Sequence, residues 1–249
     1  MNGERYLEGF KKKFCFTTQQ LNMVAYLAWL YGLVTAIEVV AEFSGNTSLR
    51  LLVKPLLMPV LVVWLVMAAP KPLSSIIRLL IAAFFFSWVG DVALMFVDRN
   101  PNFFLLGLVG FLITHLLYAV AFSRVAWPDK KALLPAKWWL LIPLLIYFAG
   151  LISVIFPPVP ADMKIPVAVY ATVIAVMVVF AMNRYGRVND KSFALVFGGG
   201  LLFMFSDSLI ALNKFVYNDH LFLSGVWIMV LYCAAQYLIG KGMLEQQGA

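Results

Sequence analysis

Apolar runs follow one another along nearly the whole chain, separated by short polar, basic or proline-rich stretches. A helix needs about 20 apolar residues to cross the hydrocarbon layer of a membrane. Because the runs are continuous rather than alternating, they predict membrane helices and not barrel strands. The predicted transmembrane spans are eight, at residues 22–42, 50–69, 74–97, 103–124, 136–156, 164–181, 192–213 and 221–240. We therefore expect an all-α polytopic membrane protein, with residues 1–249 forming a single integral membrane domain.

Composition agrees with a membrane protein and excludes most soluble classes. The chain is 63% hydrophobic and 12% charged, with a mean hydropathy of +0.90, whereas about one quarter of the residues of a soluble domain are charged. The net charge of +7 would suit a nucleic-acid partner, but the basic residues stand in short clusters between apolar runs. We interpret these clusters as topology signals and expect no nucleic-acid partner.

The distribution of basic residues predicts the orientation. Of the 19 Lys and Arg residues, 14 fall on one side of the eight spans and four on the other, with Lys54 inside a span. Cytoplasmic loops carry the excess of Lys and Arg, so both termini are expected in the cytoplasm. The short loops favour a bacterial inner membrane, with the endoplasmic reticulum as the alternative for a eukaryotic source.

A weak internal repeat relates spans that lie four apart. Residues 85–94 (FFSWVGDVAL) align with residues 201–210 (LLFMFSDSLI), and each segment carries a small residue followed by Asp. The fourth and eighth spans are also similar around Tyr118 and Tyr232. This pattern favours two parallel four-helix halves, although chance similarity between apolar helices explains it equally well.

Four charged residues fall inside the predicted spans: Glu38, Lys54, Asp91 and Asp207. A charge at membrane depth costs at least about 2.5 kcal/mol, so it normally faces a partner or a wet cavity and indicates a functional site. On the predicted topology all four lie in the outer half of the membrane. We therefore expect the chemistry of this protein to take place there.

Asp91 and Asp207 are the candidate acid–base pair. Each follows a small residue, Gly90 or Ser206, on a different helix. Two carboxyls in an apolar environment can retain one proton near neutral pH, which suits a general acid paired with a base or a cation stabiliser. The alternative is a structural role in helix packing, with Gly90 allowing close approach.

Glu38 and Lys54 have two interpretations. They can form a membrane-embedded ion pair that neutralises both, or Lys54 can hold a phosphate as a point charge. Pro55, directly after Lys54, frees backbone carbonyls that only neighbours or water can satisfy. This position therefore favours a cavity.

A second group of polar side chains occupies the fourth and eighth spans. His115 and Tyr118 lie one turn apart on one face, as do Tyr232 and Gln236. For each of them an interhelical hydrogen bond or simple packing is the structural alternative. Zinc is disfavoured because the other histidine, His220, lies far along the chain and no Cys or His ligand spacing exists, so no metal is expected.

These residues together resemble the YhhN family, which includes the animal lysoplasmalogenases. The matching elements are Glu38, Lys54-Pro55-Leu56, Gly90-Asp91, His115 with Tyr118, Ser206-Asp207, and Tyr232 with Gln236. The resemblance runs over nearly all of the chain. It implies hydrolysis of the vinyl ether bond of lysoplasmalogen to a fatty aldehyde and glycerophosphoethanolamine or glycerophosphocholine, with no metal or organic cofactor.

The resemblance also implies roles for the polar residues. Asp91 and Asp207 would be the catalytic pair, by analogy with the two carboxyls of glycosidases. Lys54 would bind the substrate phosphate, and Glu38 would bind the amine head group or hold Lys54 in place. The second group would position substrate or water. The expected partners are a single-chain lysophospholipid that enters from the bilayer and the membrane lipids, with no obligate protein partner.

Other functions compete with this interpretation. An intramembrane aspartyl protease shares Gly90-Asp91 but lacks the second half of its signature around Asp207. Alkaline ceramidase-like hydrolases need a histidine-rich metal site that two histidines cannot supply. A proton-coupled transporter or lipid flippase is the stronger alternative, because paired carboxylates and a lysine also serve proton coupling.

Overall fold

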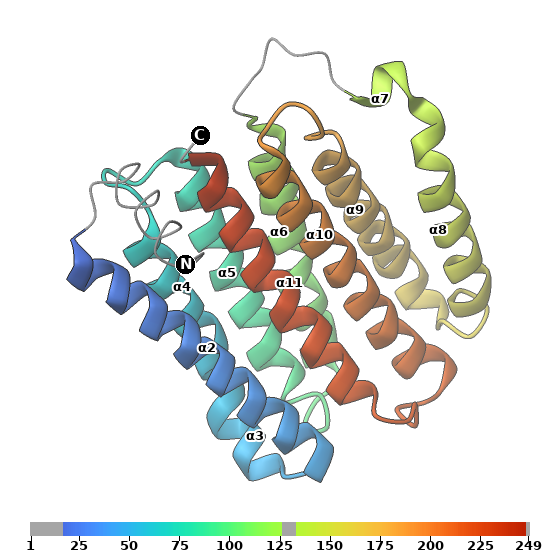
Figure 1. Ribbon diagram of the computed structural model, residues 1–249. Helices are drawn as coiled ribbons and strands as arrows, with labels where there is room; N and C mark the ends of the chain where they lie inside the picture. Colours follow the sequence, from blue (N-terminus) through green and yellow to red (C-terminus); the bar gives the residue numbers. More distant parts are fainter. Residues whose placement is uncertain (1–16, 126–132, 248–249) are drawn as a thin grey trace.

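The computed structural model describes residues 17–125 and 133–247, and these fold into a bundle of long helices (Figure 1). In chain order the segments are α2 (Thr18–Ser44), α3 (Thr47–Val53), η1 (Lys54–Leu56), α4 (Leu57–Ala68), α5 (Ser75–Leu94), α6 (Asn102–Ser123), α7 (Leu133–Ala136), η2 (Trp138–Leu141), α8 (Ile142–Ile155), η3 (Ala161–Met163), α9 (Lys164–Met182), α10 (Asp190–Ala211), η4 (Leu212–Val216) and α11 (Ser224–Gln247). Within these residues there is no strand, as predicted.

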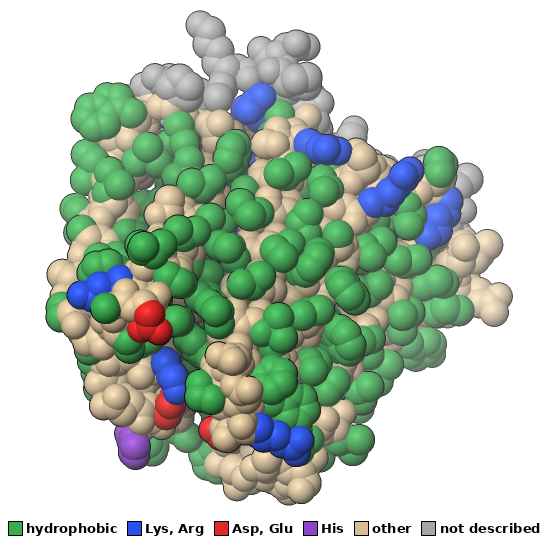
Figure 2. Space-filling view, turned by 180° about the vertical axis from the view of Figure 1, so that it is seen from behind, with side chains coloured by type: hydrophobic (Ala, Val, Ile, Leu, Met, Phe, Trp, Pro, Cys, Tyr) green, Lys and Arg blue, Asp and Glu red, His purple; other side chains and the backbone are tan. Residues whose placement is uncertain are grey.

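The prediction of eight spans is confirmed. Among the described residues, eight helical stretches are long and apolar enough to cross a membrane: Thr18–Ser44, Thr47–Ala68, Ser75–Leu94, Asn102–Ser123, Trp138–Ile155, Ala161–Met182, Asp190–Val216 and Ser224–Gln247. Large apolar side chains point outward, including Trp29 at 79% and Ile165 at 76% exposure. Figure 2 shows one apolar face, with charged side chains mainly towards its two ends.

Successive spans run in opposite directions. The connections α2–α3, α5–α6, α8–α9 and α10–α11 lie at the lower end of the bundle in Figure 1, and the α4–α5 and α9–α10 connections lie at the upper end. Which end faces the cytoplasm stays a prediction, as do the two parallel halves. Six of the basic residues counted for the orientation, at positions 5, 11, 12, 13, 130 and 131, lie outside the described residues.

Short polar residues determine where several helices begin and end. Gly45 ends α2 in the left-handed conformation at φ 65°, a geometry that glycine adopts without steric cost. Asn46 then caps α3 by accepting a hydrogen bond from Leu49 N. Ser74 and Asn189 cap α5 and α10 in the same way. These caps satisfy amide groups that the first turn of a helix leaves free.

Glycines bring the site helices together in pairs. A Cβ on Gly110 of α6 would lie 2.9 Å from the backbone nitrogen of Gly90 in α5. A Cβ on Gly199 of α10 would lie 3.0 Å from the backbone oxygen of Ala235 in α11. Both contacts therefore require the absence of a side chain, as expected for membrane helices packed through small residues. Gly199 is the middle residue of a run of three glycines, and a Cβ on the preceding Gly198 would meet nothing within 4 Å.

Proline breaks the second span beside Lys54. The helix changes to a 3-10 turn over Lys54–Leu56 before α4 continues. Because Pro59 has no N–H, the carbonyl of Pro55 lacks its helical donor. The indole Nε1 of Trp88 in α5 donates to that oxygen at 2.9 Å. A neighbouring helix thus satisfies the broken backbone and fixes the position of Lys54.

A buried arginine ties the upper end of the bundle. The side chain of Arg184, just after α9, donates to Gln246 Oε1 and Ser192 Oγ, both at 2.8 Å. Gln246 in turn donates to the carbonyl of Arg124 at 2.6 Å. Burial lowers the pKa of Arg184 to about 10, so the guanidinium stays charged at neutral pH. Arg184 follows the sixth predicted span and is one of the 14 basic residues counted on one side of the membrane. In the structure it is buried and connects α10 and α11, and through Gln246 also the end of α6.

Candidate active site

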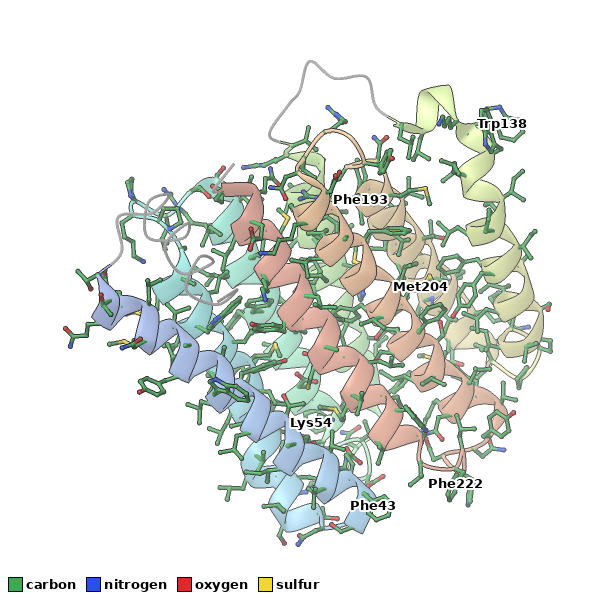
Figure 3. The ribbon with its side chains drawn as sticks, in the orientation of Figure 1. Phe43, Lys54, Trp138, Phe193, Met204 and Phe222 are labelled. Carbon is green, nitrogen blue, oxygen red and sulfur yellow. The ribbon has the colours of Figure 1, made fainter. Side chains whose placement is uncertain are left out.

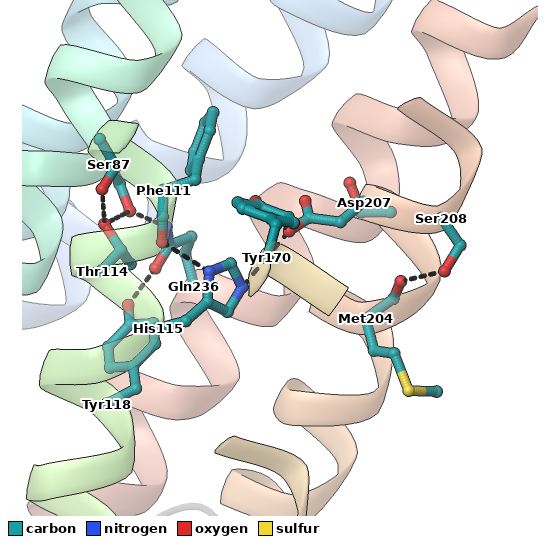
Figure 4. A network of polar contacts seen from close by, with 12 residues as sticks. Ser87, Phe111, Thr114, His115, Tyr118, Tyr170, Met204, Asp207, Ser208 and Gln236 are labelled. Carbon is teal, nitrogen blue, oxygen red and sulfur yellow. Dashed lines mark hydrogen bonds and ion pairs between the residues drawn. The ribbon is translucent and has the colours of Figure 1, made fainter. Parts of the chain in front are cut away.

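Asp207 lies where α6, α9 and α10 meet. The hydroxyl of Tyr170 in α9 donates to Asp207 Oδ2 at 2.6 Å, and the same oxygen is 3.3 Å from His115 Nε2 in α6. The side chain of Asp207 is buried. A hydroxyl from α9 thus holds this carboxyl by a hydrogen bond, and an imidazole from α6 lies beside it (Figure 4).

The contact that Nδ1 of His115 makes shows which nitrogen of the ring carries the hydrogen. Nδ1 lies 2.5 Å from the carbonyl oxygen of Phe111, one turn earlier in α6. A carbonyl accepts but cannot donate, so Nδ1 carries the hydrogen and the lone pair of a neutral ring is on Nε2. That lone pair is at the atom nearest Asp207. The sequence placed His115 among the positioning residues, and the structure brings it against a candidate catalytic carboxyl.

Asp91 is held by the last helix. The hydroxyl of Tyr232 in α11 donates to Asp91 Oδ2 at 2.6 Å. Both side chains are buried. Each of the two aspartates therefore accepts a short hydrogen bond from a tyrosine on another helix, a geometry that keeps a carboxyl oxygen in a fixed position.

Gln236, one turn after Tyr232, connects three helices. Its Oε1 accepts from the hydroxyl of Tyr118, and its Nε2 donates to Ser87 Oγ at 2.8 Å. The hydroxyl of Ser87 in turn donates to Thr114 Oγ1 at 3.1 Å, as drawn in Figure 4. The predicted Tyr118 and Gln236 are thus direct partners, and Ser87 and Thr114 join them.

Aromatic rings fill the space between the two aspartates. The ring of Phe203 lies 4.6 Å from that of His115 and 5.4 Å from that of Tyr232, measured between centroids. Phe111 packs edge-on against Phe203 and Tyr232 at 6.3 Å and 5.8 Å. This aromatic cluster makes the surroundings of both carboxyls apolar, which strengthens electrostatic interactions with any charge that forms there.

Glu38 and Lys54 do not form the ion pair that one interpretation of the sequence required. Among the ion pairs of the described residues, none joins these two side chains within 4.0 Å. Glu38 is fully buried, and neither of its carboxyl oxygens has a hydrogen-bond partner there. Lys54 is 8% exposed and lines a cavity. Across residues 17–125 and 133–247, no three His, Cys, Asp or Glu side chains converge on a point where they could hold a metal ion.

Two adjacent cavities lead from the lower end of the bundle to Asp207. The vestibule, about 320 Å³, is lined by the charged residues Glu42, Arg50, Lys54, Asp98, Lys214 and Asp219, by the polar Asn213 and Ser224, and by Gly225 and apolar residues. The slot, about 50 Å³, is lined by Asp207, Tyr170 and apolar residues. Both cavities share Leu94, Phe104 and Ile210 as wall residues. Figure 3 shows Lys54 in the lower part of the bundle.

A third, apolar groove lies between α2 and α11. Its volume is about 650 Å³, and its walls include Trp29, Tyr31, Thr35, Cys233 and Tyr237. Tyr31 donates to the carbonyl of Cys233 at 3.0 Å at its base. The groove is therefore an apolar depression between two membrane helices.

Some site residues carry only a weak signal in the sequence. Tyr170 is the single tyrosine of an otherwise apolar span, and Ser87 and Thr114 are small polar residues of a kind common in membrane helices. Tyr147 in α8, which donates to Ser208 Oγ at 2.7 Å, likewise has only a weak signal in the sequence. An isolated tyrosine at mid-span is the signal that points to Tyr170.

The fold and the site define a class of protein: a polytopic α-helical membrane protein with a polar vestibule at one end and two buried carboxyls, each hydrogen-bonded to a tyrosine. The sequence profile of the YhhN family matches residues 49–243. This chain belongs to the YhhN family.

Individual relatives agree with this assignment. Lysoplasmalogenase TMEM86B of Rattus norvegicus is 31% identical over 195 residues, which are 78% of this chain and 72% of the relative. Lysoplasmalogenase TMEM86A of Bos taurus is 31% identical over 166 residues, and the chain spans 63% of that relative's length. Lysoplasmalogenase TMEM86B of Homo sapiens is 28% identical over 178 residues, or 70% of this chain and 67% of the relative. No solved structure matches the chain significantly.

Proposed function

We propose that this protein is a lysoplasmalogenase, which hydrolyses the vinyl ether bond of an alkenyl glycerophospholipid. The relatives named above support a hydrolase of this kind. The observation that carries the proposal is the position of Asp207, which lines the slot while contacting both Tyr170 and His115. In this proposal Asp207 is the proton donor, and the reacting end of the lipid reaches it from the vestibule through the adjoining slot.

The reaction needs one proton, one stabilised cation and one water. Proton transfer to the alkenyl carbon remote from the ether oxygen breaks the carbon–carbon π bond and forms an oxocarbenium ion. Water then adds to the carbon that bears the oxygen and loses a proton, which gives a hemiacetal. Collapse of the hemiacetal breaks the carbon–oxygen bond, with the proton returning to the leaving glycerol oxygen, and releases the fatty aldehyde.

In this proposal Asp207 and His115 handle the proton. The Nε2 lone pair of His115 faces Asp207 at 3.3 Å, so a proton can be held between the two groups and delivered from the carboxyl. Tyr170 keeps the carboxyl oriented towards the slot. General acid catalysis of this type contributes about 100-fold to 10,000-fold in rate.

Asp91 is then the second carboxyl of the pair. It is held by Tyr232 on the other side of the aromatic cluster. Asp91 lines neither the slot nor the vestibule. In the proposed mechanism its negative charge therefore stabilises the oxocarbenium ion from a distance, because the low-dielectric surroundings screen it less than water would. Tyr118 and Gln236 support this arrangement by tying α6 to α11.

Lys54 binds the substrate phosphate in this proposal, because its ammonium group lines the vestibule without an ion-pair partner among the described residues. Glu38 does not line the vestibule. A role in setting the electrostatic environment of Lys54 therefore suits Glu38 better than contact with the head group. The alkenyl chain enters from the bilayer, as the apolar outer surface permits.

Purified protein in detergent tests the proposal. The substrate is alkenyl-glycerophosphoethanolamine, with acyl-glycerophosphoethanolamine as the matched comparison. We expect release of fatty aldehyde from the first and no fatty acid from the second. Binding without turnover, followed by movement of lipid only in sealed vesicles, would instead identify a transporter or flippase.

A further inference from the structure

The vestibule contains equal numbers of positive and negative side chains. Its charged lining residues are Arg50, Lys54, Lys214, Glu42, Asp98 and Asp219. Three of these are cationic and three anionic at neutral pH. The lining is therefore electrically neutral as a whole, which suits a zwitterion better than a group with a net negative charge.

Four of these six side chains already form ion pairs. Arg50 Nε lies 2.9 Å from Glu42 Oε1, and Lys214 Nζ lies 2.9 Å from Asp219 Oδ2. The carboxyl of Glu42 lies close to Gly225, where there is no side chain to displace it. These pairs satisfy one another and offer little charge to a ligand.

Lys54 and Asp98 are the two charged residues of the vestibule that remain. Over residues 17–125 and 133–247, neither takes part in an ion pair. Lys54 is 8% exposed and interacts electrostatically with the buried Glu38 and Asp91 beyond ion-pair distance, so direct contact with its ammonium group is still available to an anion. Asp98 is exposed just beyond α5, at the rim of the same cavity.

We propose that the vestibule binds a zwitterionic phospho-amine head group, with Lys54 on the phosphate and Asp98 on the ammonium. This inference rests on the proposed function and adds a specificity-determining residue to it. The deep cation then receives the phosphate, which adjoins the glycerol, and the rim anion receives the terminal amine. The order of the charges in the cavity thus matches their order along the lipid, with the reacting end directed towards the slot.

Asp98→Asn tests the assignment with two substrates. For alkenyl-glycerophosphoethanolamine we expect kcat/KM to fall about two- to fivefold, because an ion pair at the exposed rim is lost. For alkenyl-glycerophosphate, which has no amine, we expect kcat/KM to stay the same or rise. Asp162→Asn is the matched control, because Asp162 is an exposed aspartate at the same end of the bundle that does not line the vestibule. Equal effects on both substrates, or no effect on either, would overturn the assignment.

A binding measurement separates this inference from the proposed function. Saturated alkyl-glycerophosphoethanolamine and alkyl-glycerophosphate cannot be hydrolysed at a vinyl ether, and their affinities for the wild type and Asp98→Asn can be compared by titration calorimetry. A selective loss of affinity for the amine-bearing lipid supports the role of Asp98 even if no aldehyde is formed by the wild type. An unchanged affinity ratio refutes that role even if the wild type is an active lysoplasmalogenase.

Discussion

Tyr170 of α9 donates its phenolic hydrogen to Oδ2 of Asp207 in α10 at 2.6 Å. The same carboxyl oxygen faces the imidazole of His115 in α6 at 3.3 Å. Three different helices, α6, α9 and α10, therefore meet at one carboxyl. Because Tyr170 and Asp207 also share the wall of the slot, this contact holds the carboxyl at the slot.

Replacing Tyr170 with Phe tests whether this orientation matters for the reaction. The ring is retained but the hydrogen bond to Asp207 is lost, so we expect kcat to fall about tenfold, in line with one hydrogen bond to a charged group. The rate of aldehyde release from purified protein is the measurement. Tyr185→Phe is the control, because Tyr185 is 52% exposed at the opposite end of the bundle. A wild-type kcat in Tyr170→Phe would show that Tyr170 does not act on Asp207.

Asp207→Asn and Asp91→Asn keep the size of each side chain while removing its acid–base function. We expect each change to lower kcat by about 100-fold or more, because general acid–base catalysis or cation stabilisation is lost. Aldehyde release is measured after the folded state has been checked by thermal unfolding in detergent. Near-full activity in either folded variant would remove that residue from the mechanism.

His115→Phe separates proton handling from packing. A phenyl ring can keep the edge-on contact with Phe203, which lies 4.6 Å away, but it has no Nε2 to share a proton with Asp207. We expect a drop in kcat with KM within about twofold, because an interaction made only during the chemical step affects kcat alone. His220→Phe serves as the comparison, since His220 is exposed in the α10–α11 connection. If both variants have the same kinetics, His115 is only a packing residue.

Gly199→Ala tests the contact between α10 and α11. The new methyl group would lie 2.8 Å from Ile239 Cγ1 and 3.0 Å from Ala235 O, so the helices must separate. We expect a loss of stability of about 1–3 kcal/mol, as for overpacked cores. Gly198→Ala is the neighbouring control, because a Cβ there meets nothing within 4 Å. Thermal unfolding in detergent compares the two, and equal midpoints would argue against a tight interface at Gly199.

The sequence by itself determined the class of structure. Hydropathy is a local property, and a run of apolar residues long enough to cross a membrane must form a helix because no other single segment satisfies its backbone in lipid. The eight spans were therefore predictable within a few residues at most ends. The rarity of charge in such spans also singled out Glu38, Lys54, Asp91 and Asp207.

Only the tertiary structure decided how these residues are partnered. The rotation of each helix and its neighbours depends on side-chain packing between distant segments, which local patterns do not encode. Tyr170 therefore appeared as a site residue only when α9 was seen against α10, and Arg184 changed from a loop charge to a buried connector. The structure also decided that Glu38 and Lys54 form no ion pair, and which charges in the vestibule are paired. The spacing of charges along a chain cannot determine these three-dimensional contacts.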